Sequence, residues 1–226
     1  MSESSPPPTE QLPKQRFLED NLEMTMREML PLMQARILER TTYFGIRTLK
    51  NPLDFWLYQE LIHQVQPDVI LEIGNFCGGS LLALAHQCDL RRCGRVIGLD
   101  IDQKQIGEIV RQHPRITLLE GDAVTNSGLV REMISPADRV LIIEDSAHTY
   151  ENTLAVLREY SDLVSVESYF IVEDGNCHHG LDVGPSPGPY EAVLEFMQGN
   201  SQFVIDRICE SFFVTWNPLG FLRRIQ

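Results

Sequence analysis

Three carboxylates and one histidine follow two apolar runs, and together they suit metal-assisted proton transfer. Asp145 and His148 come after the run VLIIE, and Glu173 and Asp174 end the run YFIVED. If the two runs are neighbouring parallel strands, about 4.8 Å apart, the carboxylates meet at one edge of a sheet. Uncompensated, they would repel one another or take up protons, and a hard cation such as Mg²⁺, which prefers oxygen ligands, would relieve this. The pattern predicts a metal site at Asp145, Glu173 and Asp174.

A simpler interpretation remains open, because acidic residues at strand ends often only cap the next helix, as Asp145 could. His148 lies three residues after Asp145 and can face the same site if the turn between them is already helical. An imidazole with a pKa of about 6.5 accepts protons at neutral pH. A lone histidine is more often structural, but beside an activated hydroxyl His148 is a candidate general base.

The stretch VILEIGNFCGGS, residues 69–80, joins an apolar run to a glycine-rich turn and an apolar helical start. Such a strand, turn and helix aims backbone N–H groups at an anionic ligand group. The glycines are spaced G-x-x-x-G, which differs from the G-x-G-x-x-G dinucleotide fingerprint. Any α/β domain can turn on glycines, so this stretch alone does not establish a ligand site.

Acidic residues also follow the next two expected strands. Asp100 ends RVIGLD about 25 residues after the glycine turn, where a carboxylate can accept hydrogen bonds from a ribose diol. Glu120 and Asp122 flank Gly121 after the following strand, within reach of an adenine amino group. Each signal is weak alone, since such acids are often merely solvated. Together with the glycine turn they indicate a cofactor that contains a nucleoside.

The segment NCHHGLDVGPSPGPY, residues 176–190, is too long and too rich in Gly and Pro for a simple connection. Loops of this kind beside a site often act as lids or substrate selectors. Cys177, His178 and His179 could suggest a soft-metal site, but adjacent residues seldom share one metal. Contact with a substrate is the better hypothesis for His178 or His179.

Alternating apolar runs and helical segments must position these residues, and they predict a mostly parallel sheet with helices on both faces. In such sheets ligands bind beyond the carboxyl ends of the strands, where the acids lie. We expect strands at 69–73, 95–99, 116–119, 139–143, 168–172, 203–206 and 211–215. Helices are expected near 53–65, 79–88, 103–112, 126–134, 150–163 and 189–198.

The chain is expected to divide into three parts. Residues 1–13, rich in Ser and Pro, are expected to be a disordered tail. Residues 14–52 form an N-terminal helical extension or lid, with apolar residues at helical spacing over 17–40, an expected kink at Pro31 and a loop at 41–52. This segment either belongs to the core, or covers a pocket or pairs with another subunit. Residues 53–226 form the main domain.

Composition excludes several classes of function. The formal charge of −13 argues against a nucleic-acid surface, and lysine occurs only at positions 14, 50 and 104. No apolar run approaches the roughly 18 residues of a membrane span, and the N-terminus lacks the features of a secretory signal. Five cysteines without a C-x-x-C predict reduced thiols. We therefore expect a soluble cytoplasmic protein without nucleic-acid or membrane partners.

Five segments, LEIGNFCGGS, GLDID, EGD, EDSAHTY and IVEDG, occur in this order and resemble the Mg²⁺-dependent S-adenosylmethionine O-methyltransferases of the catechol O-methyltransferase type. The run from KNPLDFWLYQELI to TWNPLGFLRR more closely resembles the cephalosporin hydroxylase-like family, which is similar to macrolide-sugar O-methyltransferases. The resemblance covers about residues 45–224. It implies a Rossmann-like class I methyltransferase domain with a seven-stranded sheet in the order 3-2-1-4-5-7-6. It also implies S-adenosylmethionine and Mg²⁺, or another divalent cation, as cofactors.

Carried over by position, the resemblance places Gly74 near the methionine part of the cofactor, Ser80 near its carboxylate, Asp100 at the ribose and Asp122 beside the adenine. His148 falls where the catechol enzymes have a lysine base, whereas the sugar enzymes resemble this chain in having histidine. The implied metal ligands are Asp145, Glu173 and Asp174. The cofactor-binding set is Glu72, Gly74, Asn75, Phe76, Ser80, Asp100, Ile101, Asp122, Ala123 and Asp145, and candidate substrate contacts are His148, Tyr150, His178 and His179.

The expected function is O-methylation of a vicinal hydroxyl on a small natural product, such as a sugar, a catechol or a polyketide-type acceptor, by a homo-oligomer. One alternative is a cephalosporin hydroxylase-like component of an oxidation or methoxylation step. A facial iron triad needs two histidines and a carboxylate, however, and only His148 sits at a strand end. Another alternative is a non-catalytic S-adenosylmethionine-binding protein. It predicts a missing site residue, whereas the three carboxylates and His148 are all present.

Overall fold

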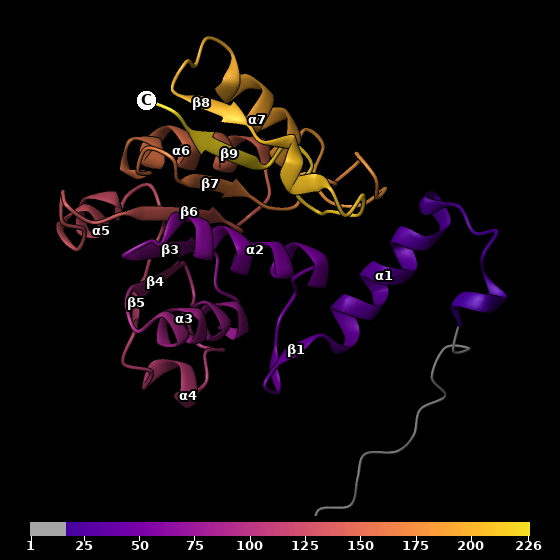
Figure 1. Cartoon of the computed structure of the whole chain (residues 1–226), viewed down its shortest axis with the longest axis horizontal. Coiled ribbons are helices and arrows are strands. Elements are labelled where there is room, and N and C mark those ends of the chain that lie inside the picture. Colours follow the sequence, from indigo (N-terminus) through magenta and orange to yellow (C-terminus); the bar gives the residue numbers. More distant parts are fainter. Residues whose placement is uncertain (1–16) are drawn as a thin grey trace, which may run out of the picture.

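A seven-stranded sheet forms the centre of the computed structural model, which describes residues 17–226. The expected tail, residues 1–13, lies outside the described residues. The strands are β3 (Val69–Ile73), β4 (Arg95–Asp100), β5 (Ile116–Glu120), β6 (Val140–Glu144), β7 (Tyr169–Val172), β8 (Phe203–Ile205) and β9 (Phe221–Arg224). Their spatial order is β5-β4-β3-β6-β7-β9-β8, which confirms the predicted order 3-2-1-4-5-7-6. Only β9 runs against its neighbours (Figure 1).

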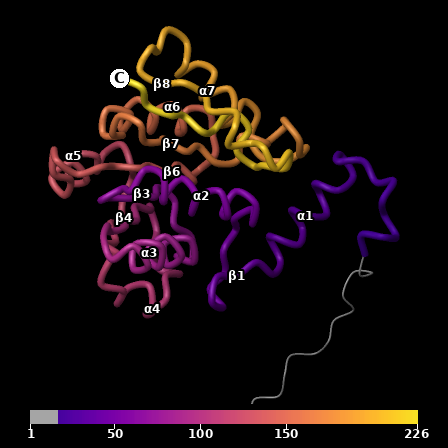
Figure 2. The backbone as a smooth tube through the Cα atoms, in the orientation of Figure 1, coloured from indigo at the N-terminus to yellow at the C-terminus, as the bar shows by residue number. Residues whose placement is uncertain are grey.

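Parallel pairing starts at β3 and extends in both directions. β4 and β5 lie on one side of β3, and β6 and β7 on the other, so the earlier and later strands occupy opposite halves of the sheet (Figure 2). Every residue of β3 and β6 is buried, as expected for strands covered on both faces. This burial explains why both strands read as nearly continuous apolar runs.

Helices cover the two faces of the sheet. On one face, α2 (Pro52–Val65) and α3 (Gly79–Arg91) pack Leu61 and Leu84 against Ile70 and its neighbours. On the other face, α6 (Tyr150–Tyr160) and α7 (Pro189–Met197) join Leu71 in a second core. Alternate residues of β3 point into the two cores, as a period of two requires. Each fully buried leucine contributes roughly 1.5–3 kcal/mol to this packing.

The expected strand at 211–215 is wrong. The last strand is β9, and the run FFVTW instead turns after the short helix η3 (Arg207–Glu210). Phe213 takes a left-handed φ of 64° and is 85% exposed, which is incompatible with a paired strand. Just before β9, the backbone passes so close to β7 that a Cβ at Gly220 would lie 2.0 Å from the backbone oxygen of Val172.

Several shorter elements also differ from expectation. The helix expected over 103–112 shortens to α4 (Glu108–Arg111), and the one over 126–134 to α5 (Ser127–Glu132). Asp102 accepts a hydrogen bond from the backbone of Lys104, and such local bonds compete with helix formation. The expected loop at 41–52 contains a hairpin of β1 (Thr42–Tyr43) and β2 (Ile46–Arg47). The helix expected over 150–163 ends at Tyr160 as α6 (Tyr150–Tyr160), and the short helix η2 (Ser161–Leu163) follows it directly.

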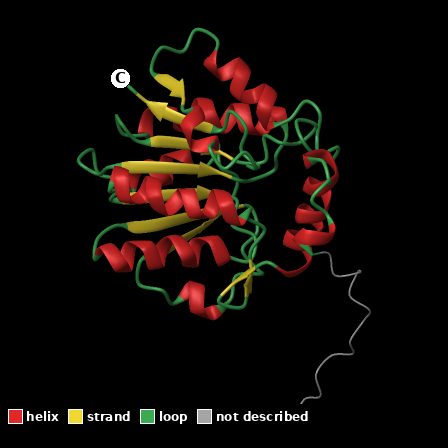
Figure 3. Cartoon of the chain, turned by 45° about the vertical axis from the view of Figure 1, so that its right-hand side comes forward, coloured by secondary structure: helices red, strands yellow, loops and turns green. Residues whose placement is uncertain are grey.

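The N-terminal extension is two helices, not one. η1 (Leu18–Asp20) is followed by α1 (Met26–Arg40), whose start is fixed by a reciprocal capping box between Thr25 and Glu28. Pro31 lies inside α1, which continues past it. α1 stands beside the main body (Figure 3), and Ile37 is its one buried residue, packed with Leu181 and Trp216. The extension is therefore not part of the main core.

No helix within residues 17–226 has the length and apolarity that crossing a membrane demands.

Candidate functional site

A cavity of about 680 Å³ lies at the carboxyl ends of the parallel strands, a size typical of small-molecule sites. Its walls come from the turn after β3, the ends of β4, β5 and β6, and the segment that follows β7. Gln34 and Leu38 of α1 complete one side. The predicted cofactor residues on the walls are Gly74, Asn75, Phe76, Ser80, Asp100, Ile101, Asp122, Ala123 and Asp145.

The turn between β3 and α3 depends on glycine at position 74. Gly74 has a φ of 90°, and a Cβ there would lie 1.9 Å from the backbone oxygen of Asp145. The backbone N–H groups of Asn75 and Phe76 donate to Asp100 Oδ2 at 2.5 and 3.1 Å. The Asp100 carboxylate thus ties the end of β4 to the turn after β3 and is itself held on the cavity wall.

Asp122 and Ala123 are fixed at the end of β5 by local bonds. Asp122 Oδ1 accepts from the backbone N–H of Thr125 at 2.9 Å, and the Tyr160 hydroxyl donates to the Ala123 carbonyl at 2.6 Å. Glu72 is the exception among the predicted cofactor residues, because it is fully buried behind the wall. There its Oε2 accepts from the Ser80 hydroxyl at 2.9 Å.

His148 lies beside two of the predicted metal ligands. Its Nε2 is 3.4 Å from Asp174 Oδ2 and 3.9 Å from Asp145 Oδ1. The turn between Asp145 and His148 is not helical: His148 has a left-handed φ of 55°, and α6 begins only at Tyr150. Thr149 caps α6, so the alternative in which Asp145 only caps that helix does not hold. The strained turn, not helical spacing, brings the imidazole to the carboxylates.

Lys50 is the important residue of the site that sequence reasoning missed. Its Nζ donates to Asp145 Oδ2 at 2.5 Å and to Glu173 Oε1, and lies 3.2 Å from Glu72 Oε1. Only 4% of Lys50 is exposed. The available signal was a lysine directly before Asn51 and Pro52, which start a helix. That signal does not reveal partners so far away in the sequence.

The cluster carries more negative than positive charge. Burial, followed by the charge of Asp145, raises the pKa of Glu173 well above its ordinary value even though Lys50 opposes the shift. Burial also raises the pKa of Asp174, against the opposing effect of His148. Burial would lower the pKa of Lys50, but the nearby carboxylates outweigh it and raise that pKa well above its usual range. One ammonium therefore does not compensate these carboxylates.

The donor set fits a hard divalent cation, because it is rich in carboxylate oxygens and has excess negative charge. The ligand atoms form two groups that share Asp145, each within 4.8 Å: Asp145, His148 and Asp174, and Glu72, Asp145 and Glu173. The predicted ligands Asp145, Glu173 and Asp174 are thus divided between two adjoining groups. Lys50 occupies the second group.

Three of the predicted substrate contacts lie elsewhere. The Tyr150 hydroxyl donates to Glu195 of α7. His179 stacks on Tyr190 with ring centroids 3.7 Å apart, and its Nε2 lies 2.6 Å from Glu191 Oε1.

His178 lines a smaller cavity of about 250 Å³ between α1 and the 176–190 segment. Side-chain direction at a helix start or in an irregular loop depends on local backbone angles, which residue spacing does not specify. The 176–190 segment lines the main cavity instead through Asn176, Cys177, Val183, Gly184 and Pro185.

A family profile described as "Rhamnosyl O-methyltransferase/CmcI" matches residues 35–225. The chain belongs to this family. The match begins within α1, so it includes Leu38 of the cavity wall but not Gln34, and it extends through β9.

Rhamnosyl O-methyltransferases of Mycobacterium bovis and Mycobacterium tuberculosis are 31% identical to this rhamnosyl O-methyltransferase/CmcI family member over 161 residues. Those residues span 68% of this chain and 65% of each relative, just under two thirds of the relatives' length. The Mycobacterium leprae enzyme is also 31% identical, and 69% of its length is covered.

Solved structures show the same fold. CmcI determined with Mg and S-adenosylmethionine superposes with a TM-score of 0.67 at 21% identity, covering 98% of this chain and 90% of CmcI. An O-methyltransferase from Bacillus cereus in complex with SAH gives a TM-score of 0.55 at 19% identity, and the superposition covers 83% of this chain and 86% of that enzyme. The family member therefore has the Rossmann-like class I methyltransferase fold.

Proposed function

We propose that this protein transfers the methyl group of S-adenosylmethionine to a hydroxyl of a small-molecule acceptor, with the help of a divalent cation. The observation that carries the proposal is His148, held beside Asp145 and Asp174 in a cavity whose other end is formed by the glycine turn and Asp100. A candidate base and a candidate cofactor cradle thus share one enclosure. The names of the relatives, which are O-methyltransferases, support the same reaction.

The cofactor would lie along the ends of β3, β4 and β5. Gly74 lets the backbone approach closely, Asp100 would accept hydrogen bonds from the ribose, and Asp122 and Ala123 would border the adenine. Ser80 and the start of α3 would face the carboxylate of the methionine part. When bound, S-adenosylmethionine supplies the electrophilic methyl group.

Asp145 and Asp174 would hold the cation, with Glu173 directly behind them. A bound divalent cation supplies Lewis acidity, which lowers the pKa of an acceptor hydroxyl. His148 would take the hydroxyl proton at Nε2, and Asp174, whose Oδ2 lies 3.4 Å from that atom, would stabilise the protonated ring. The cavity walls exclude water and fix the acceptor against the methyl donor, and such positioning can supply roughly 7–11 kcal/mol.

The acceptor end of the cavity combines polar and apolar walls. Gln34 and Asn176 offer hydrogen bonds, and Leu38, Val183 and Trp216 offer apolar surface. This mixture suits a sugar or another acceptor with vicinal hydroxyls. In this proposal α1 acts as a lid, since it contributes both Gln34 and Leu38 and packs on the body through Ile37.

An oxidation function would need a different ligand set. A facial iron triad uses two histidines and a carboxylate, whereas within residues 17–226 His148 is the one histidine that lines the main cavity. A non-catalytic binding protein would bind S-adenosylmethionine without turnover, whereas our proposal predicts methyl transfer. Both alternatives are therefore decided by the same experiment.

The test is methyl transfer from S-adenosylmethionine labelled at the methyl group to a panel of rhamnosides, other vicinal diols and catechols. We expect Mg²⁺-dependent labelling of at least one acceptor, loss of turnover in EDTA, and largely unchanged cofactor binding in EDTA. Full activity in EDTA would contradict the role of the metal. Oxygen consumption without methyl transfer would favour the oxidation function, and cofactor binding without any turnover would favour a binding protein.

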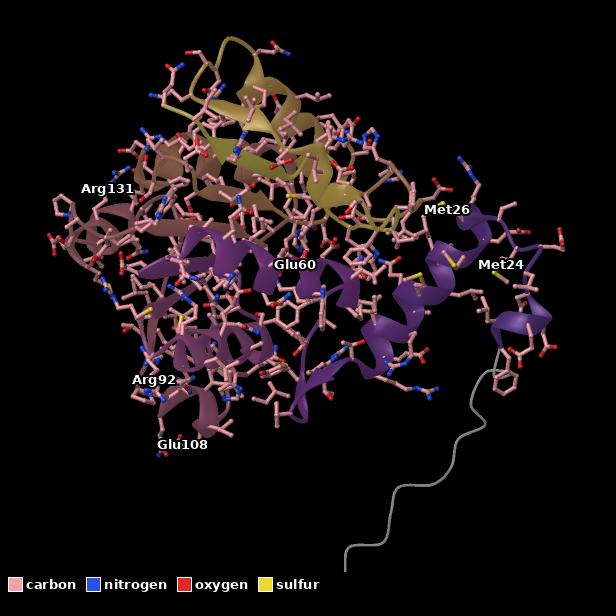
Figure 4. All side chains as sticks on the ribbon, in the orientation of Figure 1. Met24, Met26, Glu60, Arg92, Glu108 and Arg131 are labelled. Carbon is pink, nitrogen blue, oxygen red and sulfur yellow. The ribbon has the colours of Figure 1, made fainter. Side chains whose placement is uncertain are left out.

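We also propose that the protein is a homo-oligomer. Leu18, Leu22 and Met26 of the N-terminal extension are exposed apolar side chains. Met24 and Met26 lie at the end of α1 that is remote from the sheet (Figure 4). Three exposed apolar side chains on one short segment make it a candidate protein interface. A second copy of the chain covering this face would also hold α1 over the cavity.

A further inference from the structure

Lys50 enters the protein interior from a rigid point of the backbone. It immediately precedes Asn51, whose side chain caps α2 by accepting from the backbone N–H of Leu53 at 3.1 Å, and Pro52 begins the helix. The ammonium is thereby carried from the N-terminal extension to the ends of β3, β6 and β7. This is the only lysine of the described residues in the site, since Lys104 is exposed and pairs with Asp102.

The carboxylates around Lys50 form two half-sites that share Asp145. We name Glu72, Asp145 and Glu173 the inner half-site and Asp145, His148 and Asp174 the outer half-site; within each, the ligand atoms lie within 4.8 Å of one another. Asp145 presents Oδ2 to Lys50 and Oδ1 to His148, so its two oxygens serve different half-sites.

The inner half-site receives its one counter-charge and most of its hydrogen bonds from the protein itself. Glu173 Oε1 accepts from Lys50 Nζ and, at 2.8 Å, from the Tyr58 hydroxyl, which in turn accepts from Asn217 Nδ2 at 2.9 Å. Glu72 Oε1 is buried without a hydrogen bond, and the Lys50 ammonium at 3.2 Å is the charge that compensates it. The outer half-site has no such lysine and opens on the cavity.

We propose that Lys50 is a positioning residue that serves as a permanent internal cation for the inner half-site. It holds one oxygen each of Asp145 and Glu173, and so leaves Asp145 Oδ1 and Asp174 for the exchangeable divalent cation. The outer assignment rests on the proposed function, whereas the role of Lys50 in the inner half-site does not. The ammonium occupies the place where a second divalent ion would otherwise bind.

The proposal predicts that a divalent ion can replace the ammonium. In Lys50→Met the side chain keeps its approximate length and loses its charge, which leaves the buried Glu72 and Glu173 and the partly buried Asp145 without their ammonium counter-ion. Removal of a unit charge a few ångströms away strongly favours cation binding at low effective dielectric. We expect the variant to bind Mn²⁺ at least about tenfold more tightly than the wild type, or to bind one more ion.

The experiment measures Mn²⁺ binding by electron paramagnetic resonance, without cofactor or acceptor, and thermal unfolding in EDTA and in Mg²⁺. Lys50→Met should unfold at a lower temperature than wild type in EDTA and recover in Mg²⁺ by more than wild type gains. Lys50→Arg keeps the charge and should bind Mn²⁺ as the wild type does. Lys104→Met, which removes an exposed lysine, is the matched control and should change neither measurement.

Equal Mn²⁺ binding and an equal response to Mg²⁺ in Lys50→Met and wild type would overturn the proposal. The same holds if Lys50→Arg behaves like Lys50→Met. If Lys50→Met does not fold in either buffer, the double variant Lys50→Met/Glu72→Gln decides, because it removes one buried negative charge together with the positive one. The proposal expects the double variant to fold, and failure to fold would contradict it.

Failure of this proposal is distinguishable from failure of the proposed function. A wild type that binds no Mn²⁺, with a Lys50→Met variant that does, would remove the metal from the proposed reaction and leave the internal cation in place. If the wild type and the Lys50→Met variant bind Mn²⁺ equally, the internal-cation role of Lys50 fails and the metal of the proposed reaction stands. Methyl transfer itself is measured separately.

Discussion

His148 shows how a single residue is set for its task by its backbone. Its left-handed φ places Nε2 between Asp145 and Asp174, although the chain is not helical there. A non-glycine residue in this conformation is strained, and such strain concentrates at functional sites. The position of His148 in the sequence indicated the correct neighbourhood, but the conformation that brings it there could not be predicted from spacing.

Replacement of His148 by Ala should lower kcat by about 10²–10⁴, because the acceptor proton then has no nearby base. Affinity for S-adenosylmethionine should remain close to that of wild type, since His148 is not among the residues proposed to hold the cofactor. Tyr150→Phe, which removes only the hydroxyl that donates to Glu195, is the control and should retain activity. An unchanged kcat in the His148 variant would rule out its role as base.

Asp54 gives a prediction for stability against pH. Burial raises its pKa to about 6, although Thr215, Trp216 and Asn51 donate hydrogen bonds that oppose the shift. A raised carboxyl pKa means that the folded state holds the proton more tightly, so Asp54 reduces stability as the pH rises from about 4 to about 6. The full cost, at most about 3 kcal/mol, is present above pH 6.

Asp54→Asn should therefore gain stability relative to wild type as the pH rises from 4 to 7. The amide oxygen of the replacement can still accept from the backbone N–H of Trp216. Urea unfolding of both proteins across this range measures the difference and cancels the other titrating groups. A stability difference that does not vary with pH would show that Asp54 has an ordinary pKa.

At the scale of elements, burial decided which predictions from the sequence succeeded. β3 and β6 are buried on both faces, so their apolar runs marked them to within about one residue. The apolar run FFVTW misled because Phe213 turns into solvent and the chain pairs with β7 only from Phe221. Lys50 was missed for a different reason: its partners are 95 and 123 residues away, and no local pattern reports such a pair.

The turn after β3 should not tolerate a side chain at position 74. In Gly74→Ala the new Cβ would overlap the Asp145 backbone and the residue would keep an unfavourable positive φ. We expect a loss of at least about 3 kcal/mol in unfolding free energy, together with loss of S-adenosylmethionine binding. Denaturant unfolding and calorimetric titration measure the two effects.

Gly128→Ala provides the matched control for the turn. Gly128 lies in α5, and a Cβ there meets nothing within 4 Å. Alanine should stabilise this helix by roughly 0.5–1 kcal/mol. If the two variants had similar stability, the close approach of β3 and β6 at Gly74 would not be a constraint on the fold.

For the whole molecule, the main question is what covers the N-terminal extension. The main domain has one hydrophobic core on each face of its sheet. Leu22 and Met26, by contrast, are 71% and 47% exposed on a segment that leads to a wall of the cavity. Burial of such side chains between copies would contribute about 25 cal/mol per Å² of apolar surface. In the proposed oligomer, association and closure of the cavity would be coupled through α1.

The double variant Leu22→Glu/Met26→Glu should consequently reduce the size of the particle measured by size-exclusion chromatography with light scattering. Circular dichroism should be unchanged, because neither residue is in the main core. The same variant should raise KM for the acceptor more than it lowers kcat, since Gln34 and Leu38 would no longer be held at the cavity. Leu90→Glu, at an 81% exposed position on the main domain, should alter neither property.

A wild type that is monomeric at micromolar concentration, or a double variant of unchanged size, would show that the extension does not mediate assembly. In that case only the packing of Ile37 with Leu181 and Trp216 would hold α1 over the cavity.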